Sequence, residues 1–180
     1  MSRIDYMNAK GFLQPDERKY LYKVSRETVP TISGVMINIG VEYGASMACL
    51  RAGNPTAWLV GIDIDMSKYE GPKDDRIILI QTRSYNAYLF WKKPIDLLFV
   101  DGDHGFKGVM DDTLWTLYLR PGKLVIYQDC YDWDVRPPVP HKVCPGVNKA
   151  VETWSTSNQS GAWTELDYVG TSRVFKRREL

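Results

Sequence analysis

Short apolar segments recur along the chain, separated by stretches of helical periodicity. The apolar segments cover residues 35–40, 57–64, 76–81, 95–100 and 124–127. Each is rich in β-branched residues and lacks strict polar alternation, which is typical of strands buried on both faces. Helical spacing is found in residues 46–52, 84–91 and 106–119. This alternation predicts right-handed βαβ units and a mostly parallel α/β sheet.

Two further regions flank this core. A helix is predicted from Pro15 to the residue before Pro30, because Pro15 suits a first helical turn and the acids that follow it complement the helix dipole. The proline-rich residues 131–145 predict a stiff loop near the active site, followed by a helix over 147–154 and a hairpin over 163–176. We expect one domain over residues 1–180, with residues 1–33 as an N-terminal cover region.

Composition and charge exclude several classes of protein. Of the 180 residues, 44% are hydrophobic and 25% are charged, as in a globular chain. The 23 basic and 22 acidic residues give a formal net charge of +1, so no overall field favours nucleic acid or an anionic membrane. We expect neither partner. The chain shows no signal peptide or membrane span, and its three cysteines have no CxxC spacing, so a cytoplasmic protein is expected.

Acidic residues and glycines gather directly after the predicted strands. In an open α/β sheet, ligands bind beyond the carboxyl ends of the strands, so these residues are candidates for one site. Each alone is an ordinary turn former, but five strand ends together favour a ligand site. The set is Gly40, Glu42, Gly44, Ser46, Asp63, Asp65, Thr82, Arg83, Ser84, Asp101, Gly102, Asp103, His104, Gln128, Asp129 and Cys130.

The turn after the first strand suits an adenosine-containing ligand. Gly40 and Gly44 permit a tight turn and a close approach, and a helix begins near Ser46 with free N–H groups. The spacing is neither that of a dinucleotide fingerprint nor that of a phosphate loop. Asp63 comes about twenty residues later, where an acid accepts hydrogen bonds from ribose hydroxyls.

The fourth and fifth strands end in carboxylates. Asp101, Asp103 and Asp129 are expected in one cleft, where like charges raise one pKa or recruit a cation. His104 stands beside them as a general base or as an orienting group.

With these residues in view, the chain resembles the class I S-adenosylmethionine-dependent methyltransferases, and especially a small family with a DGDH segment. The likeness rests on residues 38–46, 60–63, 96–104 and 121–129, and it runs from about residue 34 to residue 154. It implies a Rossmann-like fold, with a seven-stranded, mostly parallel sheet, an antiparallel last strand and helices on both faces.

The resemblance also implies roles for individual residues. Asp63 would hold the ribose of S-adenosylmethionine, Ser84 would border the adenine, and Asp101 would lie beside the methionine end. The full implied cofactor set is Gly40, Glu42, Gly44, Ser46, Asp63, Ile64, Ser84 and Asp101. Asn38 departs from the family, which usually has an acid there.

Some members of this family bind a divalent cation such as Mg²⁺. In this chain the ligands would be Asp101 and Asp129, with Gln128 or Cys130 as a further ligand, and Asp103 or His104 would be the catalytic base. A hard cation prefers oxygen, which makes Cys130 a poor ligand.

These features favour an O-methyltransferase that acts on a hydroxyl of a small molecule or glycan. The alternative from another class is a binding or assembly protein that keeps the donor site without turnover. A nucleic-acid methyltransferase is disfavoured by the neutral charge. Tyr131, Trp133 and His141 are candidates for stacking on the acceptor, and the six tryptophans allow for a homodimer.

Overall fold

A computed structural model describes residues 4–130, 144–157 and 162–179, and in it the strands form one seven-stranded sheet. The sheet order is β3-β2-β1-β4-β5-β7-β6, and β1 to β5 are parallel while β7 runs antiparallel to both β5 and β6. The strands are β1 Val35–Ile39, β2 Trp58–Asp63, β3 Ile77–Gln81, β4 Ile95–Val100, β5 Leu119–Tyr127, β6 Trp163–Val169 and β7 Ser172–Arg177. The predicted sheet, including its antiparallel last strand, is confirmed.

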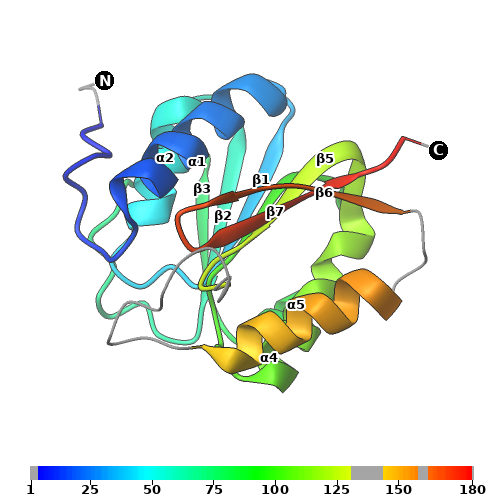
Figure 1. Ribbon diagram of the computed structural model, residues 1–180. Helices are drawn as coiled ribbons and strands as arrows, with labels where there is room; N and C mark the ends of the chain where they lie inside the picture. Colours follow the sequence, from blue (N-terminus) through cyan, green and yellow to red (C-terminus); the bar gives the residue numbers. More distant parts are fainter. Residues whose placement is uncertain (1–3, 131–143, 158–161, 180) are drawn as a thin grey trace.

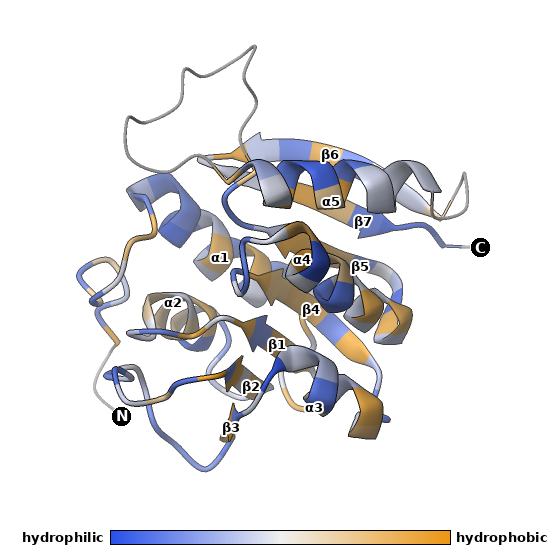
Figure 2. Cartoon of the chain, turned by 90° about the horizontal axis from the view of Figure 1, so that it is seen from below, coloured by the Kyte–Doolittle hydropathy of each residue, from blue (hydrophilic) through white to orange (hydrophobic). Residues whose placement is uncertain are grey.

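Helices cover both faces of the sheet. One face carries α1 Pro15–Thr28 and α2 Ala45–Gly53, and the other carries α3 Ser84–Phe90, α4 Phe106–Thr113 and α5 Pro145–Ser157 (Figure 1). Two apolar clusters fill the spaces between the sheet and these layers. Figure 2 shows hydrophobic residues concentrated on β1, β4 and β5, between the two layers.

The predicted helix over 106–119 is wrong in its second half. The α-helix ends at Thr113, a 3₁₀ turn covers Leu114–Tyr118, and β5 begins at Leu119 rather than at residue 124. Periodicity alone does not separate a short buried helix from a strand, and Trp115 and Leu119 are both fully buried here. Pro121 is tolerated in β5 because pairing with β7 begins only at Leu124.

The strand order reverses between β1 and β4, and the carboxyl ends of these two strands lie close together. Gly40 follows β1 with φ +80°, and a Cβ atom there would overlap the backbone carbonyl of Asp101. The crevice of a doubly wound sheet opens at such a switch point. Glycine at position 40 therefore brings the two halves of the candidate site together.

The structure bears on two further sequence expectations, which concern the proline-rich loop and membrane-spanning helices. Tyr131, Trp133 and His141, with most of the predicted loop 131–145, lie outside the described residues. Within the described parts of the chain, no helix has the length and apolarity needed to cross a membrane.

Candidate active site

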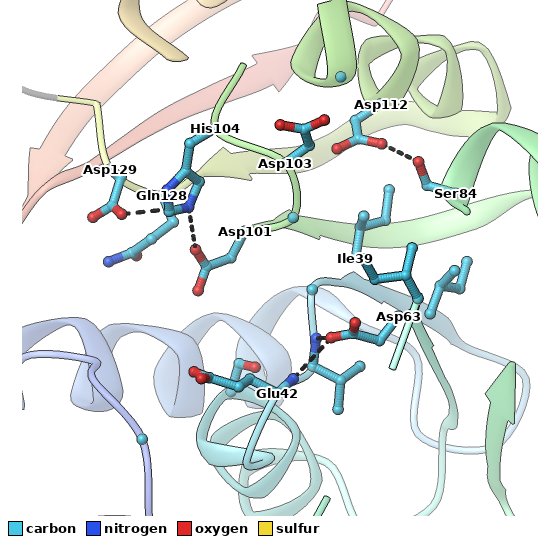
Figure 3. Close-up of a pocket in the computed structure, with 18 of the residues that line it drawn as sticks. Ile39, Glu42, Asp63, Ser84, Asp101, Asp103, His104, Asp112, Gln128 and Asp129 are labelled. Carbon is cyan, nitrogen blue, oxygen red and sulfur yellow. Dashed lines mark hydrogen bonds and ion pairs between the residues drawn. The ribbon is translucent and has the colours of Figure 1, made fainter. Parts of the chain in front are cut away.

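A cavity of about 970 Å³ opens at the carboxyl ends of β1, β2, β4 and β5. Small-molecule sites typically measure roughly 300–1,000 Å³. Of the predicted site residues, those that line the cavity are Gly40, Glu42, Ser46, Asp63, Ile64, Ser84, Asp101, Asp103, His104, Gln128 and Asp129. Figure 3 shows the carboxylates of Asp63 and Asp101 entering the same space from β2 and β4.

Asp63 holds the glycine turn in place. Its Oδ2 accepts hydrogen bonds from the backbone N–H groups of Val41 (2.7 Å) and Glu42 (2.9 Å), and its Oδ1 accepts one from Asp65 (3.1 Å). These bonds stabilise the turn even though Glu42 has a φ of +41°, which a residue with a Cβ rarely adopts. The carboxylate thus links the end of β2 to the turn after β1 at the cavity wall.

Gly44 differs from the expectation that it lines the cavity. It is the N-cap of α2 with φ +95°, and a Cβ there would lie 2.7 Å from Gly71 Cα and 2.8 Å from the Tyr69 ring. Gly44 is therefore needed for packing against residues 69–71, on the far side of the turn.

Asn38 and Ser46 form a buried polar pair beneath the turn. Asn38 Nδ2 donates a hydrogen bond to Ser46 Oγ at 2.8 Å, and both side chains are almost fully buried. Since a carboxylate has no proton to donate, the amide here supports Ser46 in a way that the family's usual ionised acid would not.

His104 lies between two carboxylates at the other end of the cavity (Figure 3). Its Nε2 is 3.7 Å from Asp101 Oδ1 and 3.5 Å from Asp129 Oδ2. Burial raises the pKa of Asp101 to about 6, and the charge of Asp129 adds to this effect while the contact with His104 opposes it. His104 therefore has the carboxylates of two neighbouring strand ends within 4 Å of Nε2.

Asp103 is fixed against the start of α4. Its Oδ1 accepts a hydrogen bond from the Gly105 N–H at 2.8 Å, and a Cβ at Gly108 would overlap its carboxylate. Asp103 therefore lines the cavity in a defined position, held by a backbone N–H group.

Ser84 donates a hydrogen bond to Asp112, a residue that sequence reasoning missed. Asp112 is 2% exposed, and its Oδ2 has no hydrogen-bond partner among the described residues. Burial raises its pKa to about 7; the hydrogen bond from Ser84 opposes this shift, and the negative charges of Asp103 and Asp111 add to it. The signal available in the sequence was an acidic residue at a core-facing position of the helix predicted over residues 106–119.

The two side chains suggested as additional metal ligands point elsewhere. Gln128 Nε2 lies 3.0 Å from Thr171 Oγ1 and 3.3 Å from the carboxylate of Glu17, and Gln128 Oε1 accepts a bond from Ser172. Cys130 is fully buried in the core, and burial raises the pKa of its thiol to about 12.

Cys144 lies where Cys130 was expected. Single ligand atoms of His104, Asp129 and Cys144 lie within 4.8 Å of one another. The sequence did not indicate this group, because Cys144 is distant in the chain and belongs to no metal-binding spacing.

The segment before α1 closes one side of the cavity, another contribution that sequence reasoning missed. Residues 11–14, Glu17 and Thr171 line the cavity with the strand ends. Glu17 is buried and accepts hydrogen bonds from the backbone N–H groups of Gln14 (2.8 Å) and Thr171 (2.7 Å). The first of these bonds is part of a capping box, which is the sequence pattern that could have pointed to this residue.

The cavity fits S-adenosylmethionine in chemistry as well as in size. Asp63 places a carboxylate beside the turn for the ribose hydroxyls, and Asp112 Oδ2 is a buried acceptor without a partner among the described residues. Such an acceptor suits the N–H donors of a nucleoside. The residues present therefore fit an adenosine-containing methyl donor.

Comparisons with known proteins agree with this geometry. A family model described as a methyltransferase domain matches residues 37–130, which is more than half of the chain. An uncharacterised protein of Acanthamoeba polyphaga mimivirus is 27% identical over 132 residues, or 64% of this chain. The chain spans 58% of the length of that relative.

Solved structures share the fold at low sequence identity. A putative O-methyltransferase from Klebsiella pneumoniae is 18% identical, with TM-score 0.69 over 93% of this chain and 82% of that one. The O-methyltransferase TomG from Streptomyces achromogenes, solved with S-adenosylmethionine, has 18% identity and TM-score 0.70 over the same shares. The mycinamycin-pathway methyltransferase MycE, solved with Mg²⁺ and S-adenosylhomocysteine, has 18% identity and TM-score 0.66 over 94% of this chain and 51% of that one.

The matched residues 37–130 include the glycine turn, Asp63, the DGDH segment and Asp129, which are the residues that build the cavity. The chain therefore belongs to this methyltransferase domain family.

Proposed function

We propose that this protein transfers a methyl group from S-adenosylmethionine to a hydroxyl oxygen of a small molecule or glycan. The observation that carries the proposal is one cavity with two chemically different ends. Asp63 and the glycine turn form one end, and Asp101, Asp103, His104 and Asp129 form the other. Such a transfer requires a donor site and a proton-accepting site in one cavity.

The acceptor end can remove a proton. S-adenosylmethionine supplies an electrophilic methyl group on a sulfonium sulfur, and the hydroxyl oxygen that receives it has to lose its proton. Asp103 and His104 both line the cavity and can accept that proton. Asp101 and Asp129 place carboxylate oxygens 3.7 and 3.5 Å from His104 Nε2.

Three observations support the proposed class of acceptor and a location in the cytoplasm. The net charge of +1 provides no general attraction for a polyanion. TomG and MycE, which share the fold, belong by name to the synthesis of tomaymycin and mycinamycin. Cys49, Cys130 and Cys144 are free thiols, which agrees with the reducing cytoplasm.

The donor site is tested by the Asp63→Ala variant. For the wild type, S-adenosylhomocysteine at about a hundred times its dissociation constant adds roughly 2.7 kcal/mol to the free energy of unfolding. We expect Asp63→Ala to lose this ligand-induced shift, measured by thermal unfolding against its own ligand-free midpoint. Asp75→Ala, an exposed acid away from the cavity, is the control and keeps the shift. A wild type without any shift would contradict the proposal.

Turnover separates the enzyme from the binding protein without activity. We expect Asp103→Asn to lower the rate of S-adenosylhomocysteine release at least a hundredfold with a hydroxyl acceptor, because a neutral amide does not take up the proton. The affinity for the donor, measured by calorimetry, stays within about threefold, since Asp103 is held against α4 rather than against the glycine turn. Tight donor binding by a wild type that methylates no member of a broad hydroxyl panel would favour the binding protein instead.

A further inference from the structure

Three side chains with nitrogen, oxygen and sulfur donors converge beside the acceptor end of the cavity. Cys144 Sγ lies 3.4 Å from His104 Nδ1 and 3.8 Å from Asp129 Oδ2. Asp129 Oδ2 is in turn 3.5 Å from His104 Nε2. Among the described residues, these three form the group whose ligand atoms lie close enough to share one metal ion.

The fold builds this convergence from three separate elements. Asp129 follows β5 in a left-handed conformation, with φ +59°. Cys144 directly precedes α5, and a Cβ at Gly146 would overlap the backbone carbonyl of His104. Glycine at position 146 thus lets the start of α5 approach the DGDH turn closely enough for Cys144 to reach His104.

The donor set differs from the one that Mg²⁺ selects. Mg²⁺ takes oxygen ligands almost exclusively, whereas imidazole, carboxylate and thiolate together are ligands of Zn²⁺ and similar transition metals. Tetrahedral bonds of about 2.0–2.3 Å place neighbouring ligand atoms roughly 3.3–3.6 Å apart. The separations of 3.4 and 3.8 Å from the sulfur are close to this requirement without rearrangement of the backbone.

We propose that His104, Asp129 and Cys144 bind a borderline transition metal ion, with Zn²⁺ as the reference. Nδ1 is the ligand atom of His104, because it lies 3.4 Å from the sulfur. Nε2 lies 3.7 Å from Asp101 and 3.5 Å from Asp129 Oδ2, so Asp129 has to turn from Nε2 toward the ion when it binds. Asp101 then accepts the Nε2–H and orients the ring, as carboxylates do for zinc-bound histidines. The site is a property of these residues and does not depend on the methyl acceptor.

With His104 as a metal ligand, the two candidate bases, His104 and Asp103, have different roles. An imidazole that binds a metal through Nδ1 and holds its Nε2 proton toward Asp101 accepts no proton from a hydroxyl. Asp103, which lies outside the ligand group, then remains the proton acceptor. Three protein ligands also leave a coordination position, as catalytic zinc sites do.

Cobalt absorption tests the site without any activity measurement. Chelator-treated full-length protein is titrated with Co²⁺, and we expect one equivalent to bind with a near-ultraviolet thiolate-to-cobalt band and intense visible bands of a tetrahedral ion. Zn²⁺ abolishes these bands stoichiometrically, whereas millimolar Mg²⁺ leaves them unchanged. Cys144→Ser loses the near-ultraviolet band and binds Zn²⁺ at least tenfold more weakly. Cys49→Ala, a buried cysteine in α2 on the other face of the sheet, behaves like the wild type.

Two results would overturn the proposal: a wild type that shows no thiolate band, or a Cys144→Ser variant that keeps it. Displacement of Co²⁺ by Mg²⁺ would assign an oxygen-only site instead. A second measurement covers the case in which Cys144→Ser does not fold. X-ray absorption of the zinc-loaded wild type should show one sulfur neighbour, and a shell of nitrogen and oxygen alone refutes the ligand set.

Discussion

At the scale of single residues, the cavity contains aspartates of the same chemistry in opposite environments. Asp63 receives three backbone N–H bonds, which compensate its negative charge. Asp112 is buried with one hydrogen bond, from Ser84, and an oxygen that has no hydrogen-bond partner among the described residues. Asp63 therefore holds the turn in place, whereas Asp112 costs stability whenever it is charged.

Asp112 makes the stability of the protein depend on pH. Its pKa is about 7 in the folded state and 3.8 in the reference state, so the folded protein binds more protons in this interval. The free energy of unfolding therefore falls as pH rises from about 4 to about 7 and is level above that range. We expect Asp112→Asn to remove this loss and to be more stable than the wild type at pH 8 by roughly 4 kcal/mol, because one unit of pKa difference corresponds to about 1.4 kcal/mol. The measurement is urea unfolding of both proteins at pH 4.5 and pH 8.

The neighbouring Asp111→Asn variant is the matched control. Asp111 pairs with the exposed Lys107 at 2.7 Å, and such a pair contributes only a few tenths of a kcal/mol. Because the charge of Asp111 is the smallest of the contributions to the raised pKa of Asp112, Asp111→Asn should keep most of the pH dependence of the wild type. Asp101 also titrates near pH 6 but is present in every variant, so its effect cancels. Equal pH dependence in Asp112→Asn and the wild type would show that Asp112 is not the titrating group.

At the scale of elements, α1 holds the preceding segment over the cavity through a single arginine. The buried guanidinium of Arg18 donates to the carbonyls of Tyr6 (3.0 Å), Ala9 (2.7 Å), Gly11 (3.0 Å) and Leu13 (3.0 Å). Charged donors to backbone acceptors are among the stronger hydrogen bonds, and no apolar side chain reproduces them. The wall formed by residues 11–14 thus depends on α1 rather than on the sheet.

Replacement of Arg18 should open this wall. We expect Arg18→Met to increase the rate of trypsin cleavage after Lys10 at least tenfold and to weaken the binding of S-adenosylhomocysteine, because the lining segment is released. Cleavage is followed by mass spectrometry and affinity by calorimetry. Lys19→Met, an exposed position in the same helix, should change neither quantity. If cleavage after Lys10 is unchanged in Arg18→Met, other contacts hold the segment.

At the scale of the whole molecule, the sequence predicts the alternating strands and helices but not the contacts between residues that are distant in the chain. The parallel sheet follows from apolar segments that alternate with helices, and a parallel sheet places Asp63, Asp101 and Asp129 at one edge. The place of Cys144 was not predictable, because the direction of α5 depends on packing against the DGDH turn through Gly146. The boundary between α4 and β5 failed for a related reason, since Trp115 is buried by tertiary contacts that periodicity does not contain.

The contact between Gly40 and the carbonyl of Asp101 restricts how this sequence can change in evolution. Every other amino acid carries a Cβ, and at this position the Cβ would force apart the two strand ends that form the cavity. Codon 40 therefore has no neutral replacement, and no single compensating change elsewhere restores the fit, since the obstacle is backbone. As lineages of this protein diverge, residue 40 is where we expect their sequences to remain identical longest.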